Sequence, residues 1–257
     1  MKFVLWVLIA ASTVESYGQI SPPGLDDTNV ALWSAIGINQ EISKRWSISA
    51  YAGNSTKSNP DNFLLTQKQA MFILNQETKF EISDRWSLSF CASYRRQNEY
   101  QAEHPFLSDD PRIKIENRYY LRFYFNENFN KIKLTVSLRP ELRLFYSDRG
   151  HRWSPLDRGL RFRLKAQVSI PLSPSGANQL IVANEILTAT DRERKENTYD
   201  WTRYSFTENR LSTYFRHTFN HFLSTDVGIM HQIKASGEYA AHVGIDLIFT
   251  NPFGTKK

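Results

Sequence analysis

The feature that most constrains this chain is a strict alternation of apolar and polar residues along unusually long segments. The clearest segment spans residues 159–172, where the even-numbered positions from Leu160 to Leu172 are apolar and the odd-numbered positions from Arg161 to Ser169 are polar. A period of two is that of an extended strand with two different faces, and no helix separates residues in this way. Segments 112–125 and 131–146 repeat the pattern. The sequence therefore predicts an all-β protein built from long strands.

Weaker alternation extends the prediction to about eleven strands. The additional segments lie near 29–41, 46–54, 68–82, 86–98, 178–189, 204–219, 223–234 and 238–249. Short turns at 43–45, 83–85, 127–130, 173–177 and 220–222 alternate with longer polar loops at 55–67, 99–111, 147–158 and 190–203. Short turns at one rim and long loops at the other are typical of outer-membrane β-barrels.

The strand count sets a puzzle for this interpretation. Single-chain bacterial barrels normally have an even number of strands, and with the short turns on the periplasmic side the strand near Asn29 would begin at the outer rim. Either a further strand lies within 19–30 or one of the eleven lies outside the wall. We expect a single antiparallel up-and-down transmembrane β-barrel of about 12 strands, with 10 as the alternative.

The start of the chain is typical of an export signal. Lys2 precedes an apolar run from Phe3 to Ala11, which is too short to span a bilayer, and small residues follow at Ser16 and Gly18. We expect a signal peptide over residues 1–18, cleaved near Gly18-Gln19. An N-terminal extension would then cover 19–28, the barrel 29–253 and a C-terminal tail 254–257. The single cysteine, Cys91, rules out an intramolecular disulfide.

Strand length distinguishes a membrane barrel from a soluble one. No run of about 18 apolar residues occurs, so no helical span is predicted. The clearest alternating segments run to 12–16 residues, whereas strands of globular sheets average about 5–6 and membrane strands need about 9–11. A soluble secreted β-sandwich that binds ligands is the alternative, and it would pack the Leu160–Leu172 face inside.

The polar faces of the strong segments carry arginine and glutamate on neighbouring strands. We expect these side chains to form a charge network in the lumen, made by Glu116, Arg118, Arg122, Arg139, Glu141, Arg143, Arg161, Arg163, Lys165, Glu185, Glu208 and Arg210. Opposite charges there can pair and share hydrogen bonds. Such a lining would act either as a plug of salt bridges that stiffens the wall, which we favour, or as a selectivity lining for anionic solutes.

An internal repeat supports the hairpin arrangement. The segment from Glu41 to Ser49 (EISKRWSIS) returns as Glu81 to Ser89 (EISDRWSLS). The repeat places Trp46 and Trp86 just after equivalent short turns. At a rim, both would belong to an aromatic belt at the membrane interface.

The chain resembles the uncharacterised outer-membrane barrels grouped as domain of unknown function 2490. The resemblance rests on Trp33 and on repeated acidic-then-arginine signatures at 116–119 (ENRY), 140–143 (PELR) and 208–211 (ENRL). It would cover about residues 29–253. It implies an export signal and a barrel, with no established activity. The ending differs from the usual barrel terminus, because four residues follow Phe253.

The sequence carries no phosphate-binding glycine loop, zinc-type cluster or nucleophile elbow. We therefore expect no enzymatic activity, no cofactor and no metal. The remaining enzyme hypothesis is an outer-membrane lipid-modifying hydrolase, which would require His217 or His231 beside a serine and a carboxylate.

The predicted function is an outer-membrane β-barrel that is either structural or a narrow, porin-like pore. We expect it in the outer membrane of a Gram-negative bacterium. Its expected partners are outer-membrane lipids and, during insertion, the barrel-assembly machinery, and no nucleic acid. Its basic balance, a net charge of +6, would then belong to the lumen.

Overall fold

The computed structural model describes residues 25, 28–151, 153, 156–195 and 198–254. The predicted signal peptide, most of the predicted N-terminal extension and the last three residues lie outside this part. The strands are β1 (Val30–Glu41), β2 (Trp46–Lys57), β3 (Lys68–Glu81), β4 (Trp86–Tyr100), β5 (Ser108–Phe129), β6 (Ile132–Ser147), β7 (Leu156–Pro171), β8 (Asn178–Lys195), β9 (Thr198–Trp201), β10 (Ser205–Asn220), β11 (Leu223–Lys234) and β12 (Tyr239–Thr250). Within the described residues, no helix is long and apolar enough to cross a membrane.

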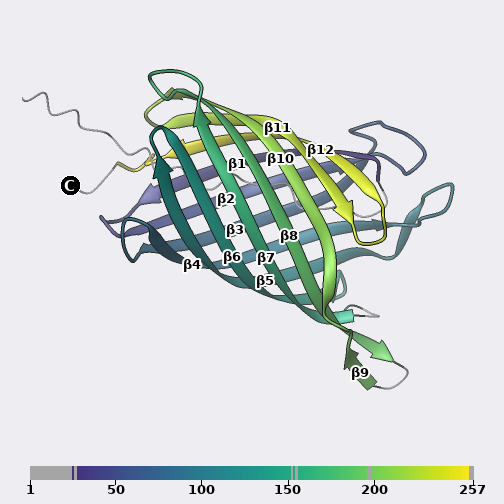
Figure 1. The fold of residues 1–257 in the computed structure, drawn as a ribbon. Coiled ribbons are helices and arrows are strands. Elements are labelled where there is room, and N and C mark those ends of the chain that lie inside the picture. Colours follow the sequence, from purple (N-terminus) through teal and green to yellow (C-terminus); the bar gives the residue numbers. More distant parts are fainter. Residues whose placement is uncertain (1–24, 26–27, 152, 154–155, 196–197, 255–257) are drawn as a thin grey trace, which may run out of the picture.

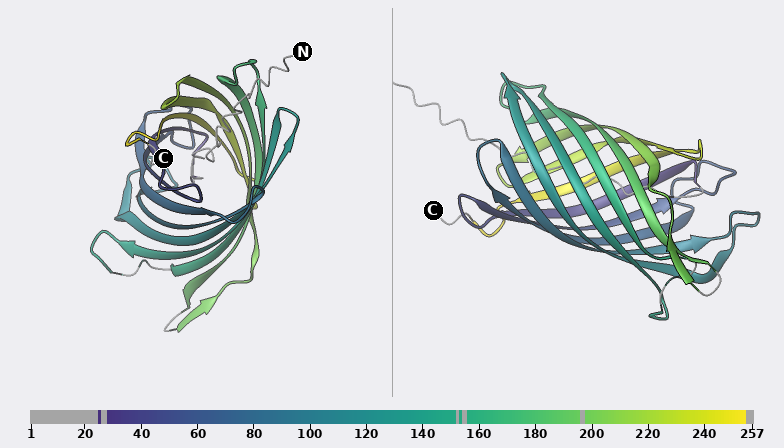
Figure 2. Two further views of the ribbon diagram at one scale, coloured as in Figure 1. Left: turned by 90° about the vertical axis from the view of Figure 1, so that its left-hand side faces the viewer. Right: turned by 60° about the horizontal axis from the view of Figure 1, so that its bottom comes forward.

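The strands form one sheet that closes on itself as a barrel (Figure 1). Each strand from β1 to β8 pairs with the next in antiparallel fashion, β8 pairs with β10, and β10 to β12 continue the wall. The ring closes where β12 lies parallel to β1, from Val30 opposite Ala241 to Asn39 opposite Thr250. The end-on view in Figure 2 shows this ring. The predicted all-β barrel is confirmed.

The parallel closure resolves the strand-count puzzle. The described sheet has twelve strands, but β9 pairs only with β8, so eleven strands make the wall. All eleven segments identified from the sequence are in the wall. In an odd up-and-down barrel the first and last strands must point the same way, and their pairing must be parallel. Accordingly, β1 begins at the rim of the long loops and β12 ends at the rim of the short turns.

The last long loop differs from the sequence prediction. Residues 190–203 were expected to be a loop, but β8 continues to Lys195 and pairs with β9 as a hairpin that projects beyond the wall (Figure 1). Charged side chains on both strands hide the alternation there. The same rim carries the loops at 58–67 and 101–107.

The apolar face of the wall points outward and its charged face points inward, which is the reverse of the usual arrangement in a soluble protein. On β7, Phe162 is 42% exposed and Leu164 is 50% exposed, whereas Arg163 between them is 5% exposed. The same inversion holds along β5 and β6, where Phe123 and Leu138 point outward and Arg118 is buried. The soluble sandwich alternative is therefore wrong, because it required the Leu160–Leu172 face inside.

The repeated nonapeptide forms two equivalent turns. In the first, the backbone N–H groups of Ile42 and Ser43 both donate to the Trp46 carbonyl, and the Trp46 N–H donates to Ser43 Oγ at 3.2 Å. In the second, Ile82, Ser83 and Trp86 make the same contacts, with the Trp86 N–H 3.2 Å from Ser83 Oγ. Equal sequence thus gives equal turn geometry.

Candidate functional site: the charged barrel interior

The first centre of the interior network is Glu116 on β5. Arg118, which lies two residues further along the same face of β5, donates to both carboxylate oxygens of Glu116, each at 2.7 Å. Arg143 on β6 donates from Nε at 2.5 Å, and Arg95 on β4 lies 3.7 Å away. Glu116 is only 3% exposed. One buried carboxylate therefore holds three arginines from three strands.

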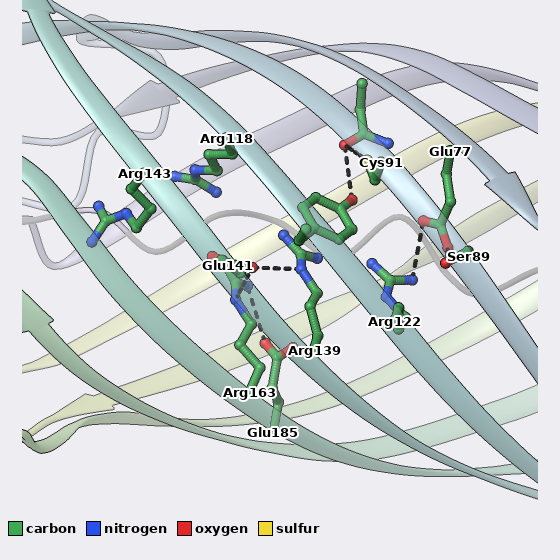
Figure 3. A network of polar contacts seen from close by, with 12 residues as sticks. Glu77, Ser89, Cys91, Arg118, Arg122, Arg139, Glu141, Arg143, Arg163 and Glu185 are labelled. Atoms are coloured by element: carbon green, nitrogen blue, oxygen red, sulfur yellow. Dashed lines mark hydrogen bonds and ion pairs between the residues drawn. The ribbon is translucent and has the colours of Figure 1, made fainter.

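The second centre is Glu141 on β6 (Figure 3). Its Oε1 lies 2.5 Å from Arg139 Nε and 2.7 Å from Arg163 Nε. These contacts are close ion pairs rather than well-aligned hydrogen bonds, since neither Nε satisfies hydrogen-bond geometry. Arg163 also lies 3.5 Å from Glu185 on β8. The network thus spans three adjacent strands at this level.

The network continues at both edges. Toward β10, Glu185 is 3.5 Å from Arg210, which donates to Glu208 at 2.6 Å. Toward β3, Arg122 lies 3.4 Å from Glu77, which accepts a hydrogen bond from Ser89 at 2.6 Å. These ion pairs include ten of the twelve predicted network residues.

The other two predicted network residues, Arg161 and Lys165, face the same interior. Arg161 lies on the same inward face of β7, yet its Nε makes no hydrogen bond within the described residues. Its cross-strand neighbour on β6 is Glu141, which the adjacent arginines already hold. Lys165 faces Glu185 across the β7–β8 ladder and also lines the interior cavity.

Sequence analysis missed Asp191, which lies 3.8 Å from Arg143, and two members on β3 and β4, Glu77 and Arg95. Both lie in strands whose polar face also carries serine, asparagine or cysteine, so their alternation was weak. The parity of each strand would have found them, because Glu77 shares its face with Asn75 and Arg95 shares its face with Cys91. Cys91 itself is buried, and its Sγ lies 3.2 Å from Asn75 Oδ1.

The opposite side of the interior, on β10–β12, β1 and β2, is filled by large rings against glycines. Tyr214 is fully buried and covers Gly228 and Gly244, where an added Cβ would lie 2.7 Å and 2.9 Å from its ring atoms. Trp33 likewise covers Gly53, where a Cβ would lie 2.1 Å from the indole. We call this side the close-packed wall and β5–β8 the charged wall.

Besides Glu208 and Arg210, the close-packed wall carries further buried charged groups. Arg216 donates to both oxygens of Asp226, at 2.6 and 2.7 Å. Asp246 lies directly across from Asp226 and accepts a hydrogen bond from Trp33 Nε1 at 2.9 Å. His242 shares the inward face with Asp246, as its strand parity predicts, and its Nε2 lies 3.1 Å from Gln232.

A cavity of about 690 Å³ lies beside the charged wall. Its lining runs from Asp84, Lys131 and Pro171 at the short-turn rim inward to Arg118 and Arg163. We call it the cup. Its inner end meets the Glu116 and Glu141 ion pairs, so the cup opens at the short-turn rim and ends against the network.

The two tryptophans of the repeat lie at the same rim, on the outer face. Trp46 is 47% exposed and packs on Phe80 with ring centroids 4.7 Å apart. Trp86 is 53% exposed and packs on Phe125 at 4.9 Å. Each pair joins neighbouring strands in register.

The hydrolase hypothesis requires His217 or His231 to lie beside a serine and a carboxylate. His217 Nδ1 lies 2.7 Å from Asn178 Oδ1. Among the described residues, neither His217 nor the exposed His231 makes a hydrogen bond to a serine or a carboxylate. In the same part of the chain, no group of three or more His, Cys, Asp or Glu side chains is placed to hold a metal ion.

In the comparison with known proteins, the chain matches a family whose function is unknown. The family model described as "Protein of unknown function (DUF2490)" matches residues 30–241, which include all three glutamate–arginine signatures. No curated protein and no solved structure gives a significant match. Because the match covers most of the sequence, the chain belongs to the DUF2490 family.

Proposed function

We propose that this protein is a non-enzymatic β-barrel of a Gram-negative outer membrane, exported through the signal peptide at residues 1–18, whose interior is closed by salt bridges. The observation that carries the proposal is the inverted polarity of the wall. Leu164 is half exposed while its neighbour Arg163 is buried, and a wall facing water would reverse this arrangement.

The outer face supports lipid as its surroundings. Exposed large apolar side chains occur on every wall strand, among them Ile36, Phe90, Leu121, Phe215 and Ile245. Monomeric soluble proteins rarely expose contiguous apolar patches above a few hundred Å². Trp46 and Trp86 at one rim fit the aromatic belt that membrane barrels place at the interface.

The interior supports a structural role more than an open pore. Glu116 and Glu141 each hold arginines from neighbouring strands, and both are almost fully buried. Paired charges of this kind cross-link the wall, and the cup ends against them. A narrow pore is the second candidate, because the cup already opens part of the interior from the short-turn rim. The expected partners are outer-membrane lipids and the assembly machinery that inserts barrels.

Fractionation tests the location. We expect the protein in detergent-extracted outer membrane, with a gel mobility that shifts on heating as the barrel unfolds. Recovery in a soluble periplasmic extract would contradict the proposal.

Substitution on the outer face tests the lipid contact directly. Leu164→Arg should destabilise the folded barrel in lipid vesicles by about 2–4 kcal/mol, the cost of a cation at the bilayer midplane. In a soluble protein the same change at a half-exposed site would be close to neutral. Leu64→Arg is the matched control, since Leu64 is exposed in the 58–67 loop and should tolerate arginine in either setting. Equal stability of both variants would contradict a lipid-facing wall.

Planar-bilayer recordings separate the plug from the pore. The wild-type barrel should pass little current if the network closes it, and charge reversal at Glu116 or Arg163 should raise the current by breaking the ion pairs. A steady wild-type current whose ion preference changes with these reversals would instead favour the narrow pore.

A further inference from the structure

The charged wall contains a row of arginines placed side by side. Arg139 on β6 lies directly across from Arg163 on β7. On its other side, β6 pairs with β5. The register there, Tyr120 opposite Glu141 and Phe123 opposite Leu138, places Arg122 of β5 opposite Arg139. We call these three residues the arginine row. Like charges directly opposite one another destabilise a sheet, so their placement requires negative charge nearby.

The carboxylates near the row are shared among several arginines. Glu141 serves Arg139 and Arg163, and Glu185 serves both Arg163 and Arg210. Each guanidinium carries about five N–H donors, while a carboxylate offers about four acceptor positions. The resident carboxylates therefore leave arginine donors of the row without a full set of acceptors.

The cup beside the row is positively charged. Its lining includes eight cationic side chains, namely Lys79, Arg118, Arg122, Lys131, Lys133, Arg139, Arg163 and Lys165. It includes four carboxyl groups, namely Glu77, Glu81, Asp84 and Glu185. Glu116 and Glu141 pair with Arg118, Arg139 and Arg163 directly behind this lining, so the excess is two positive charges. A concave site lined by one sign of charge concentrates the opposite ion.

The cup also has the size and the apolar surface that a ligand needs. Its volume of about 690 Å³ lies within the range of about 300–1,000 Å³ usual for small-molecule sites. Tyr120 is held by a hydrogen bond to Asn75 at 3.0 Å, and the Arg139 guanidinium stacks 3.6 Å from its ring centroid. Tyr124 is fixed between Arg122 and Glu77, at 2.6 and 2.7 Å.

We propose that the cup is a binding site for a small oxyanion-bearing molecule, a phosphate, carboxylate or sulfonate, which the arginine row and Lys165 hold by charge-assisted hydrogen bonds. Planar guanidinium groups match such anions in a bidentate manner. Lys131 and Lys133 near the short-turn rim attract the ligand to the opening. The inference rests on the proposed function only for the side of entry, which would be the periplasmic side.

Calorimetry on the full mature chain in detergent tests the site, with inorganic phosphate, inorganic pyrophosphate and phenyl phosphate as probes. Pyrophosphate should bind, and its affinity should fall as NaCl is raised. Arg122→Gln and Arg139→Gln should each weaken binding at least about tenfold, the loss expected for hydrogen bonds to a charged group. Phenyl phosphate should bind more tightly than inorganic phosphate if the tyrosines contact the ligand body.

The matched control is Arg192→Gln, which removes an arginine from β8 near the other rim, where it pairs with Asp157 at 3.1 Å outside the cup. It should keep the wild-type affinity within twofold. Heat-dependent gel mobility reports folding of each variant. If Arg139→Gln does not fold, Arg122→Lys replaces it, with an intermediate loss because lysine keeps the charge and lacks the fork.

Each outcome decides the proposal. Absence of binding by the wild-type protein, or equal binding by Arg122→Gln and Arg192→Gln, would overturn it. Binding by a protein that fractionates as soluble would refute the membrane location and leave the site intact, so the two proposals fail separately.

Discussion

The charged wall and the close-packed wall fill the same barrel interior in two different ways. On β5–β8 the inward positions carry arginine and glutamate, which form ion pairs along and across strands. On β10–β12, β1 and β2, Tyr214 and Trp33 cover glycines, so ring area replaces charge. An enclosed interior therefore requires its polar groups to be paired. Where few polar groups are present, large rings packed against glycines can fill the space instead. The charged wall should therefore fail by losing one charge, and the close-packed wall by gaining one methyl group.

The largest effect is expected on the charged wall, from Glu116→Gln. The change leaves Arg95, Arg118 and Arg143 without their shared counter-charge inside the barrel. Breaking a buried ion pair in this way costs about 3–5 kcal/mol. Urea unfolding followed by circular dichroism measures it. Glu81→Gln is the control, because its partner Lys79 lies near the rim and both are partly exposed. A loss below that of the control would show that Glu116 is not the centre of the network.

A slightly smaller effect is expected on the close-packed wall, from Gly228→Ala. The new Cβ would lie 2.2 Å from the Thr213 carbonyl oxygen, and a backbone atom cannot move aside. We expect a loss of about 3 kcal/mol, at the upper end of overpacking costs. Gly176→Ala is the control, because a Cβ there would meet open space. It measures the loss of a glycine without crowding, and its positive φ of 72° adds local strain. Equal losses would attribute the effect to the backbone alone.

Trp33→Phe should have an intermediate effect. It measures how much one hydrogen bond between buried polar groups stabilises the close-packed wall. It removes the N–H that donates to Asp246, and the other oxygen of that carboxylate already lacks a hydrogen bond within the described chain. An unsatisfied buried acceptor costs roughly 1–2 kcal/mol. The same unfolding assay applies. Trp86→Phe at the outer rim is the control, and a larger loss there would contradict the interior role of Trp33.

The smallest effect is expected from an ion pair at the rim, where β11 ends. Lys234 and Glu238 lie 2.5 Å apart across the turn between β11 and β12, and the glutamate is more than half exposed. Glu238→Gln should cost about 0.2–1 kcal/mol, since exposed pairs gain little in water. The loss should shrink further at high salt. A loss comparable to that of Glu116→Gln would mean that burial is not what distinguishes the network.

The sequence predicted the charged wall well because its period is strong there. The alternation along 112–125, 131–146 and 159–172 identified these strands, their polar face and seven residues of the ion-pair network. Pro140 did not interrupt the strand, because it faces outward opposite Phe162 and removes only one ladder donor. The close-packed wall was weakly predicted, since glycine and alanine carry little polarity signal. Nothing local indicates that Tyr214 must meet Gly228 and Gly244.

The sequence alone was enough to show which residues share a face of each strand, because the side-chain period of a strand is fixed at two. It also determined the two equivalent turns, which use only neighbouring hydrogen bonds. Only the tertiary structure decided how the barrel closes, which carboxylate holds which arginine and where the cup lies. These depend on strand pairing and register between residues far apart in the chain, from Val30 beside Ala241 to Arg122 beside Arg139. The period of one strand carries no information about its neighbour.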